Sequence, residues 1–391
     1  MTDVKLANPN LIVDLQRFGA TEVNACYSCG NCTATCPLAD NDATFPRRFI
    51  RLAQVGLEDD LVASKELWTC YQCGMCTTKC PTEADPAEFM ATARRFAIAH
   101  YDKTGLARLM YTRPWAAWII AGLGLLLFAG FFVTLKGTEN HAELAFFDFL
   151  SYPLIHNTGL VVMGILVLFA LIGAVSLIRD MAKRDGVTWA SLWTKEGRGR
   201  TWKALWYSVG IESLGQKRFR EDCAEDEPVE PLYRRRWLLH ALTLWGFIGL
   251  FLATTLNYGL DIIGVKPTGT WVPLWYPIRL LGTIAGLAMM YGVTWFMINR
   301  SRRSGTAKTT KPTDWMFLVL LWMTGFTGFV IEIALYVPPA PAWAYWVFLV
   351  HVAIAMELLL FVPITKFAHV MYRPIALFFY GLAKEKSKAA A

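Results

Sequence analysis

Charged residues are scarce in this sequence: Asp, Glu, Lys and Arg make up 18% of its 391 residues, against about 25% in typical soluble domains. Hydrophobic residues make up 55%, which is more apolar surface than the single core of a soluble enzyme can bury. The same composition excludes an intrinsically disordered chain, which is poor in hydrophobic residues. The segment MTDVKLANPN has no basic stretch followed by an apolar one, so no secretory signal peptide is expected there.

Cysteine is nearly absent beyond residue 80, since eight of the nine Cys lie at or before that position and only Cys223 follows. No role is predicted for Cys223, which stands in an acidic run. The chain also lacks a G-x-G-x-x-G fingerprint, so no flavin or nicotinamide fold is indicated. Paired Cys without a signal peptide favour metal binding over disulfides. The chain therefore has two chemically different halves.

Long apolar stretches begin at Pro114, and six of them can cross about 30 Å of hydrocarbon as helices. The connector 179–236 holds thirteen Lys and Arg, whereas the loops on the opposite side hold only Lys136 and Lys266. This asymmetry predicts an inner-membrane protein whose two termini are both cytoplasmic. The net charge of +7 is then a topology signal and does not suggest nucleic acid. The predicted spans are 114–135, 156–178, 237–259, 274–298, 314–337 and 343–365.

Five segments follow from this pattern. Residues 1–113 are nearly neutral and form a predicted cytoplasmic domain, followed by two membrane helices in 114–178. The connector 179–236 mixes Trp with Lys and Arg, which is typical of a helix lying in the membrane interface; a solvated cytoplasmic loop is an equal alternative. Four further membrane helices lie in 237–370, and 371–391 is a predicted cytoplasmic tail.

Two cysteine runs repeat with an offset of 44 residues: CYSCGNCTATCP at 26–37 and CYQCGMCTTKCP at 70–81. The spacing C-x2-C-x2-C-x3-C-P is that of bacterial two-cluster ferredoxins, in which the fourth Cys of each run binds the other cluster. Structural zinc usually shows two separated Cys pairs and fits less well. We therefore predict two [4Fe-4S] clusters, the first held by Cys26, Cys29, Cys32 and Cys80, the second by Cys70, Cys73, Cys76 and Cys36.

The spacer between the two runs is predicted to be helical, over Thr44–Val55 and Glu58–Trp68, and a further helix is predicted over Pro86–Tyr101. The fold class is thus mostly α: an α-helical two-cluster ferredoxin domain followed by a six-helix transmembrane cytochrome b bundle. The run PRRFIRLAQVGLEDDLVASKELWTCYQCGMCTTKCP resembles the iron–sulfur C subunit of heterodisulfide reductases. Its basic residues Arg47, Arg48 and Arg51 form either a docking face for a partner or a solvated helix face.

Histidines in the apolar half suggest haem, because an ionisable residue inside a membrane span is a functional hypothesis by default. If the last helix continues, His351 and His369 share one face of it, about 27 Å apart. His156 lies at the outer end of the second span and His240 near the inner end of the third. We therefore predict two low-spin haem b groups, an outer one bound by His156 and His351 and an inner one by His240 and His369. His141 is an alternative outer ligand.

The last helix resembles the haem-bearing final helix of the γ subunit of respiratory nitrate reductases. The phrases TDWMFLVLLWMTGFTGF and HVAIAMELLLFVPITKFAHVMYRP are closer to the membrane-bound E subunit of heterodisulfide reductase, a cytochrome b. The fusion of both halves resembles the family of membrane C subunits in the quinone-modifying oxidoreductase (Qmo) complexes of sulfate reducers. That resemblance implies electron transfer between menaquinone, the b haems, the two clusters and the cytoplasmic flavin and Fe–S subunits of such complexes (A and B), linked to adenylylsulfate reductase.

The quinone site is expected to need a proton acceptor, for which Glu332 and Glu357 are candidates; each is equally well a structural acid. The chain has no adjacent Cys pair, and so lacks the CCG motifs of catalytic heterodisulfide reductase subunits. Substrate reduction beyond the quinone is therefore assigned to partners. Two alternatives remain open: a membrane subunit that serves a disulfide- or sulfite-reducing partner, and an anchor whose cofactors are structural or sense redox state.

Overall fold

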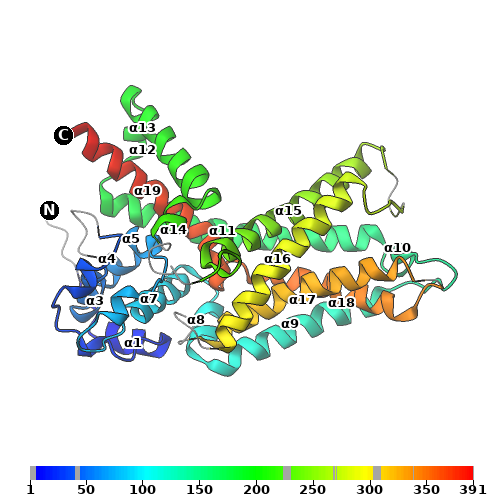
Figure 1. Cartoon of the computed structure of the whole chain (residues 1–391), viewed down its shortest axis with the longest axis horizontal. Coiled ribbons are helices and arrows are strands. Elements are labelled where there is room, and N and C mark those ends of the chain that lie inside the picture. Colours follow the sequence, from blue (N-terminus) through cyan, green and yellow to red (C-terminus); the bar gives the residue numbers. More distant parts are fainter. Residues whose placement is uncertain are drawn as a thin grey trace.

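Helices are the regular secondary structure of this protein, and no strand occurs in the part of the chain that the structure describes. That part of the computed structural model comprises residues 6–39, 45–222, 230–266, 269, 271–302, 310–337 and 339–390. Figure 1 shows short helices of the amino-terminal part at one end of a set of long helices. The predicted mostly α fold is confirmed.

The amino-terminal part is built from short helices around an apolar core that includes Phe18, Phe49, Trp68 and Phe89, each at most 1% exposed. The longest of them starts at Asp85, whose carboxylate accepts a hydrogen bond from the backbone N–H of Glu88 and so caps the helix. The elements are α1 (Leu11–Phe18), η1 (Val23–Ala25), α2 (Asn31–Ala34), α3 (Arg47–Gln54), α4 (Glu58–Val62), α5 (Glu66–Thr69), α6 (Met75–Thr78), α7 (Pro86–Tyr101) and α8 (Leu106–Thr112).

Two of the three helices predicted here are found with small changes. The helix predicted over Pro86–Tyr101 is α7, and that over Thr44–Val55 is represented by α3, with Thr44 outside the described residues. The single helix predicted over Glu58–Trp68 is wrong, because the chain forms α4 and α5 with a break between them. At the break the Ser64 hydroxyl donates to the Asp60 carbonyl, a local bond that competes with helix continuation.

Six helices of the carboxyl-terminal part are long and apolar enough to cross a membrane, as predicted. Their outward side chains are apolar too: Leu123, Leu126 and Leu127 are 62–70% exposed. Such a surface suits lipid, which offers no hydrogen bonds to polar groups. The six are α9 (Pro114–Leu135), α11 (Tyr152–Asp185), α15 (Arg236–Ile262), α16 (Pro277–Ser301), α17 (Pro312–Ala334) and α18 (Ala342–Phe361); the short α10 (Phe146–Phe149) lies between α9 and α11.

Helix α18 is the most buried of the six and packs against α9, α11 and α17. Helices α15 and α16 form a separate close pair that joins this group through contacts between α16 and α17. Gly246 on α15 allows the close approach, since a Cβ there would lie 2.6 Å from the Ala285 carbonyl oxygen of α16. In Figure 1 the α15–α16 pair slants away from α9, α17 and α18.

The prediction that one continuous helix carries both His351 and His369 is wrong. Helix α18 ends at Phe361, and a turn with η5 (Lys366–Ala368) precedes α19 (His369–Ala390). Pro363 interrupts the helix, because proline removes a backbone donor and restricts the residue before it. The predicted tail is thus largely the helix α19, which packs against α5 and α11.

The connector 179–236 contains helices as well. They are α12 (Trp189–Trp193), α13 (Lys195–Trp206), the π-helical η2 (Tyr207–Leu214), α14 (Lys217–Asp222) and η3 (Leu232–Arg234). Helix α13 and η2 pack along α19. Cys223 lies outside the described residues.

Candidate redox centres

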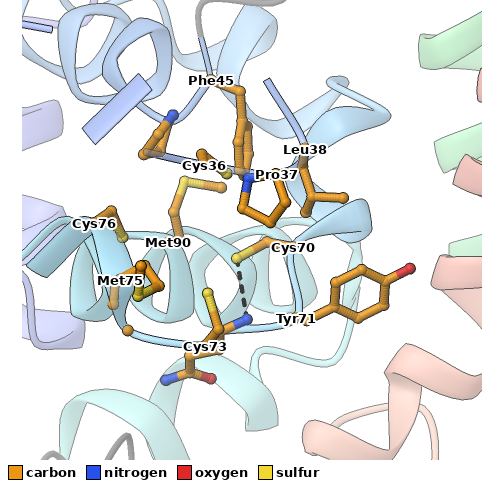
Figure 2. Close-up of a pocket in the computed structure, with 14 residues that line it drawn as sticks. Cys36, Pro37, Leu38, Phe45, Cys70, Tyr71, Cys73, Met75, Cys76 and Met90 are labelled. Atoms are coloured by element: carbon orange, nitrogen blue, oxygen red, sulfur yellow. Dashed lines mark hydrogen bonds between the residues drawn. The ribbon is translucent and has the colours of Figure 1, made fainter. Parts of the chain in front are cut away.

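The two cysteine runs fold into the same loop. In the first, Ser28 and Gly30 have φ values of 64° and 96°; in the second, Gln72 and Gly74 have 54° and 91°. These left-handed residues, at equivalent positions of the repeat, curl the backbone around the cysteines, and glycine adopts such angles at little cost. The backbone N–H of Gln72 donates to Cys70 Sγ at 3.3 Å (Figure 2).

The eight cysteines gather in two sets of four around separate cavities. Figure 2 shows the second of these cavities, with Met90 and Phe45 on its wall. Each cavity takes three cysteines from one run and the last from the other, which is the grouping given by the sequence analysis; their role as cluster ligands stays a prediction. One cavity is lined by Cys26, Cys29, Cys32 and Cys80, and the other by Cys36, Cys70, Cys73 and Cys76.

The two cavities differ in their surroundings. At the first, Cys29 is exposed and the neighbouring Tyr27 is 64% exposed. At the second, Cys70 is only 9% exposed, and Tyr71 turns away from the cavity toward the long helices (Figure 2). The first cavity therefore faces the surface, and the second faces the membrane part of the chain.

A chain of ring contacts leads from the second cavity into the helix bundle. The ring of Tyr71 stacks on Phe219 with centroids 5.2 Å apart. The Phe219 ring meets His240 edge-on at 5.5 Å, and the rings of His240 and His369 lie 6.2 Å apart. Residues 71, 219, 240 and 369 come from four distant segments, so this arrangement is a product of tertiary packing.

Both inner histidines are oriented by hydrogen bonds at Nδ1. His240 Nδ1 donates to the side-chain oxygen of Gln216 at 3.0 Å, and His369 Nδ1 donates to the Lys366 carbonyl oxygen at 2.7 Å. Nε2 of each ring then carries no proton and can bind a metal. Metal-binding histidines typically have such a partner on the other nitrogen, so the two rings fit a bis-histidine haem site.

An arginine stands one helical turn from each inner histidine: Arg236 precedes His240 by four residues, and Arg373 follows His369 by four. Arg236 donates to the carbonyl oxygens of Tyr71 and Gln72, each at 3.3 Å. Arg373 donates to the Trp68 carbonyl oxygen at 2.7 Å and lies 4.5 Å above the Tyr71 ring. The two histidine-bearing helices thus both hold the loop that contains Cys70 and Cys73.

Glu212, on η2, is a further neighbour of this loop. It is 4% exposed and accepts a hydrogen bond from the Tyr71 hydroxyl at 3.2 Å. Burial raises the pKa of the Glu212 carboxyl, while the nearby Arg218 acts in the opposite direction.

A second junction between the two parts is ionic. Asp314, at the start of α17 and 3% exposed, lies 3.3 Å from Lys366 Nζ, 3.7 Å from Arg300 and 3.8 Å from Arg95 of α7. Arg95 also pairs with Glu88 at 2.7 Å. Asp314 therefore connects α7, the end of α16 and the turn whose carbonyl orients His369.

The outer histidines are not brought together. His156 Nε2 hydrogen-bonds to the Tyr258 hydroxyl at 3.0 Å, and the two rings stack. His351 Nδ1 donates to the Thr327 hydroxyl oxygen at 2.9 Å, which leaves Nε2 free of protein partners. Within the described ranges no ring contact joins His156 to His351. His141 is 61% exposed beside Glu139. The predicted outer pairing remains untested.

The two candidate acids have different surroundings. Glu332 pairs with Arg279 at 3.3 Å and accepts a hydrogen bond from Thr283. Glu357 is 1% exposed, and neither of its oxygens has a hydrogen-bond partner among the described residues. Gly124 of α9 makes room for it, since a Cβ there would lie 2.8 Å from Glu357 Oε1. Of the two, Glu357 is the acid whose proton is not committed to a protein partner.

Sequence reasoning missed several residues of this site: Tyr71, Gln216, Phe219, Arg236 and Arg373. One signal was present, because the patterns R-x3-H at 236–240 and H-x3-R at 369–373 place each arginine on the histidine's helix face. Nothing local marks Gln216 or Phe219, which lie in the connector.

Two family descriptions match the chain. A "4Fe-4S dicluster domain" matches residues 22–84, and "Citrate utilization protein B" matches residues 106–391. The dicluster match covers both cysteine runs, so the chain carries two [4Fe-4S] clusters. No solved structure matches significantly.

Curated relatives cover both parts. The "Citrate utilization protein B" of Escherichia coli is 31% identical over 175 residues, 43% of each chain. The iron–sulfur C subunit of the CoB–CoM heterodisulfide reductase of Methanopyrus kandleri is 44% identical over 46 residues, 12% of this chain and 24% of that protein. The C subunit of a heterodisulfide, ferredoxin reductase of Methanothermobacter thermautotrophicus is 33% identical over 54 residues, 14% and 29%. The chain thus spans less than half the length of these relatives.

These matches agree with the architecture: an iron–sulfur part similar to the heterodisulfide reductase C subunit, joined to apolar helices suited to a multi-pass membrane protein and to membrane electron transfer. The second match covers residues 106–391 of 391, which is well over half of the chain. The protein belongs to the citrate utilization protein B family.

Proposed function

We propose that this chain is the membrane electron-transfer subunit of a quinone-linked oxidoreductase complex. One observation carries the proposal: ring contacts run without a gap from Tyr71, between Cys70 and Cys73, through Phe219 to the His240–His369 pair. When bound, the clusters and haem would supply one-electron transfer. The residues of the chain hold these groups in a row and exclude water between them.

The cysteine sets fit two clusters. Each set surrounds its own cavity beside a loop with left-handed residues, and in the second loop a backbone N–H already donates to sulfur. Hydrogen bonds to sulfur and solvent exposure are the main means by which a protein sets a cluster's potential. The proposed ligands are Cys26, Cys29, Cys32 and Cys80 for the first cluster and Cys70, Cys73, Cys76 and Cys36 for the second.

The His240–His369 pair fits a haem b. A histidine nitrogen bonds a metal at about 2 Å, so two rings on opposite sides of one metal have centroids roughly 6 Å apart. The observed separation is 6.2 Å. Bis-histidine ligation leaves no open position, which suits electron transfer. A second haem held by His156 and His351 requires His156 to exchange its Tyr258 hydrogen bond for a metal bond.

The exposed first cavity is the proposed docking end. A cytoplasmic flavoprotein that contacts the surface near Cys29 and Tyr27 reaches the first cluster without crossing the chain. The basic connectors place this end in the cytoplasm by the positive-inside rule. Lipid surrounds the six spans, and flavin and Fe–S subunits of the kind called A and B in Qmo complexes are the proposed partners.

Menaquinone is the proposed membrane substrate. Quinol oxidation releases protons together with electrons, so the site needs an acceptor. The uncommitted carboxyl of Glu357 is the better placed of the two candidates, since Glu332 is held by Arg279. Glu332 would act only after that ion pair opens.

Two finer assignments follow from different similarities. The resemblance to the C subunit of Qmo complexes favours a link to adenylylsulfate reductase in sulfate respiration. The match to citrate utilization protein B over residues 106–391 favours a flavoprotein partner that oxidises citrate or a related carboxylic acid. Co-purification of the tagged chain, with identification of the flavoprotein that it retains, separates the two assignments.

Redox titration of the purified protein, followed by optical and EPR spectroscopy, tests the proposal. We expect a b-type absorption band, the EPR signals of two clusters, and reduction of the haem by a menaquinol analogue. Absence of the haem band contradicts the ligand assignment. Haem that stays oxidised in excess quinol contradicts the quinone link and favours a structural or sensing role.

A further inference from the structure

The outer face of α12 and α13 exposes a group of large apolar side chains. Trp189, Trp193 and Trp202 are 68–69% exposed, and Trp206 is 63% exposed. Leu205 and Val209 follow on the same side and are also exposed, at 41% and 43%. Single exposed apolar residues are ordinary on protein surfaces, whereas an exposed group of this size marks an interaction site.

The opposite face of the same segment is already used. Ala204 and Ser208 are fully buried, and Ser208 donates to the Pro374 carbonyl oxygen of α19. A Cβ on Gly381 would lie 3.1 Å from Ala204, so the two helices are in close contact. Because residues 202, 205, 206 and 209 recur at helical spacing, they form a separate apolar stripe that points away from α19.

Basic residues flank the stripe. Between Trp189 and Trp206 the chain has four Lys or Arg and a single Glu. Lys195, Arg198 and Lys203 are exposed. Tryptophan combined with Lys and Arg on an amphipathic helix is the composition of segments that lie in the headgroup region of a bilayer, and the positive charge is complementary to anionic lipid.

Contacts with α15 place this segment at the level of the membrane. The indole N–H of Trp245 donates to the Leu214 carbonyl oxygen at the end of η2, and Gln216 bonds to His240. His240 and Trp245 lie four and nine residues inside the span that begins at Arg236. The helix that leads into η2 therefore approaches the bilayer at the inner end of α15. In Figure 1, α13 runs crosswise to α15 and α16, as a helix lying along the surface would.

We propose that α12 and α13 lie on the bilayer surface on the side of the iron–sulfur part, with the four Trp side chains among the headgroups and the basic residues binding anionic phospholipid. The bilayer is the favoured occupant because spanning helices hold both ends of the segment against it. The same segment continues into Glu212, Gln216 and Phe219, so lipid contact steadies the residues that support Tyr71 and His240.

Nitroxide labelling of the full-length holoprotein in proteoliposomes tests this surface. Labels are placed at Trp202→Cys and Trp206→Cys in a Cys223→Ser background, where the cluster cysteines are protected by their iron. Val55→Cys is the matched control, since Val55 is also an exposed apolar side chain, 42% exposed, but lies at the end of α3. Collision rates with oxygen, which partitions into lipid, are compared with those of a water-soluble nickel complex.

We expect oxygen collisions to exceed nickel collisions several-fold at residues 202 and 206, and the reverse at residue 55. Phosphatidylglycerol in the vesicles should reduce nickel access at residues 202 and 206 further than phosphatidylcholine alone. Nickel access equal to that at residue 55 overturns the proposal and assigns the stripe to water or to a protein partner. Trp189→Cys provides a further position if a variant loses its haem and cluster spectra.

Discussion

Replacing Asp314 by Asn removes the one carboxylate that the buried junction offers to three cations. Asp314 is 3% exposed and lies within 4 Å of Lys366, Arg300 and Arg95. Arg95 keeps Glu88 as a partner at 2.7 Å, but Arg300 loses its carboxylate partner among the described residues. The substitution conserves side-chain size, so it tests charge and not packing.

The expected cost is about 3 kcal/mol, at the lower end of the range of roughly 3–5 kcal/mol for removing one partner of a buried ion pair. The lower end applies because Lys366 is 44% exposed and water screens its charge. Such a change lowers the unfolding midpoint of a unit of 150–250 residues by about 2–4 °C per kcal/mol. We therefore expect a decrease of roughly 6–12 °C.

The assay is thermal loss of the iron–sulfur absorbance in detergent, with the b-type band followed in parallel. Asp14→Asn is the matched control, since Asp14 pairs with Arg17 and Arg108, which are 64% and 54% exposed. Surface pairs contribute about 0–1 kcal/mol, so this variant should unfold close to wild type. Equal midpoints for the two variants would falsify the buried network as a junction between the two parts.

Three further predictions concern the redox centres. His240→Ala and His369→Ala should each remove the same b-type band, because the two rings face one another at 6.2 Å; loss of different bands contradicts a shared haem. Phe219→Leu should slow haem reduction through the clusters several-fold and leave all spectra intact, since it removes the ring between Tyr71 and His240. Its control is Phe326→Leu, in a ring pair with Trp322, and equal rates for both variants count against the path. Glu357→Gln should suppress menaquinol oxidation more than Glu332→Gln and keep the haem band, because only Glu357 lacks a hydrogen-bond partner among the described residues; the opposite order moves the quinone site to Glu332.

Local features of the sequence predicted the modules well. Six apolar stretches predicted six spanning helices, because backbone groups in lipid must satisfy one another within the same segment. The repeated cysteine spacing predicted two equivalent loops, and Ser28 and Gln72 share a left-handed conformation at equivalent positions. Such features depend on neighbours a few residues away, which the sequence displays directly.

The errors arose where a neighbour in sequence misled. Helical periodicity joined His351 to His369, but Pro363 and the turn after Phe361 separate them. The same reasoning paired His156 with His351 by depth, whereas the structure surrounds His156 with Tyr152 and Tyr258. Depth in a membrane restricts one coordinate, and it leaves the rotation and separation of helices open.

The sequence by itself determined the cofactor type, the number of spans and the charge asymmetry, because each follows from spacing or composition along the chain. Tertiary structure alone decided which cysteine set faces the helices, which histidines meet, and what lies between them. Tyr71, Phe219 and His240 meet through packing across 148 and 21 residues of chain, with Arg236 and Arg373 holding the loop. Contacts of that kind depend on how whole helices pack side by side, and no local pattern encodes that packing.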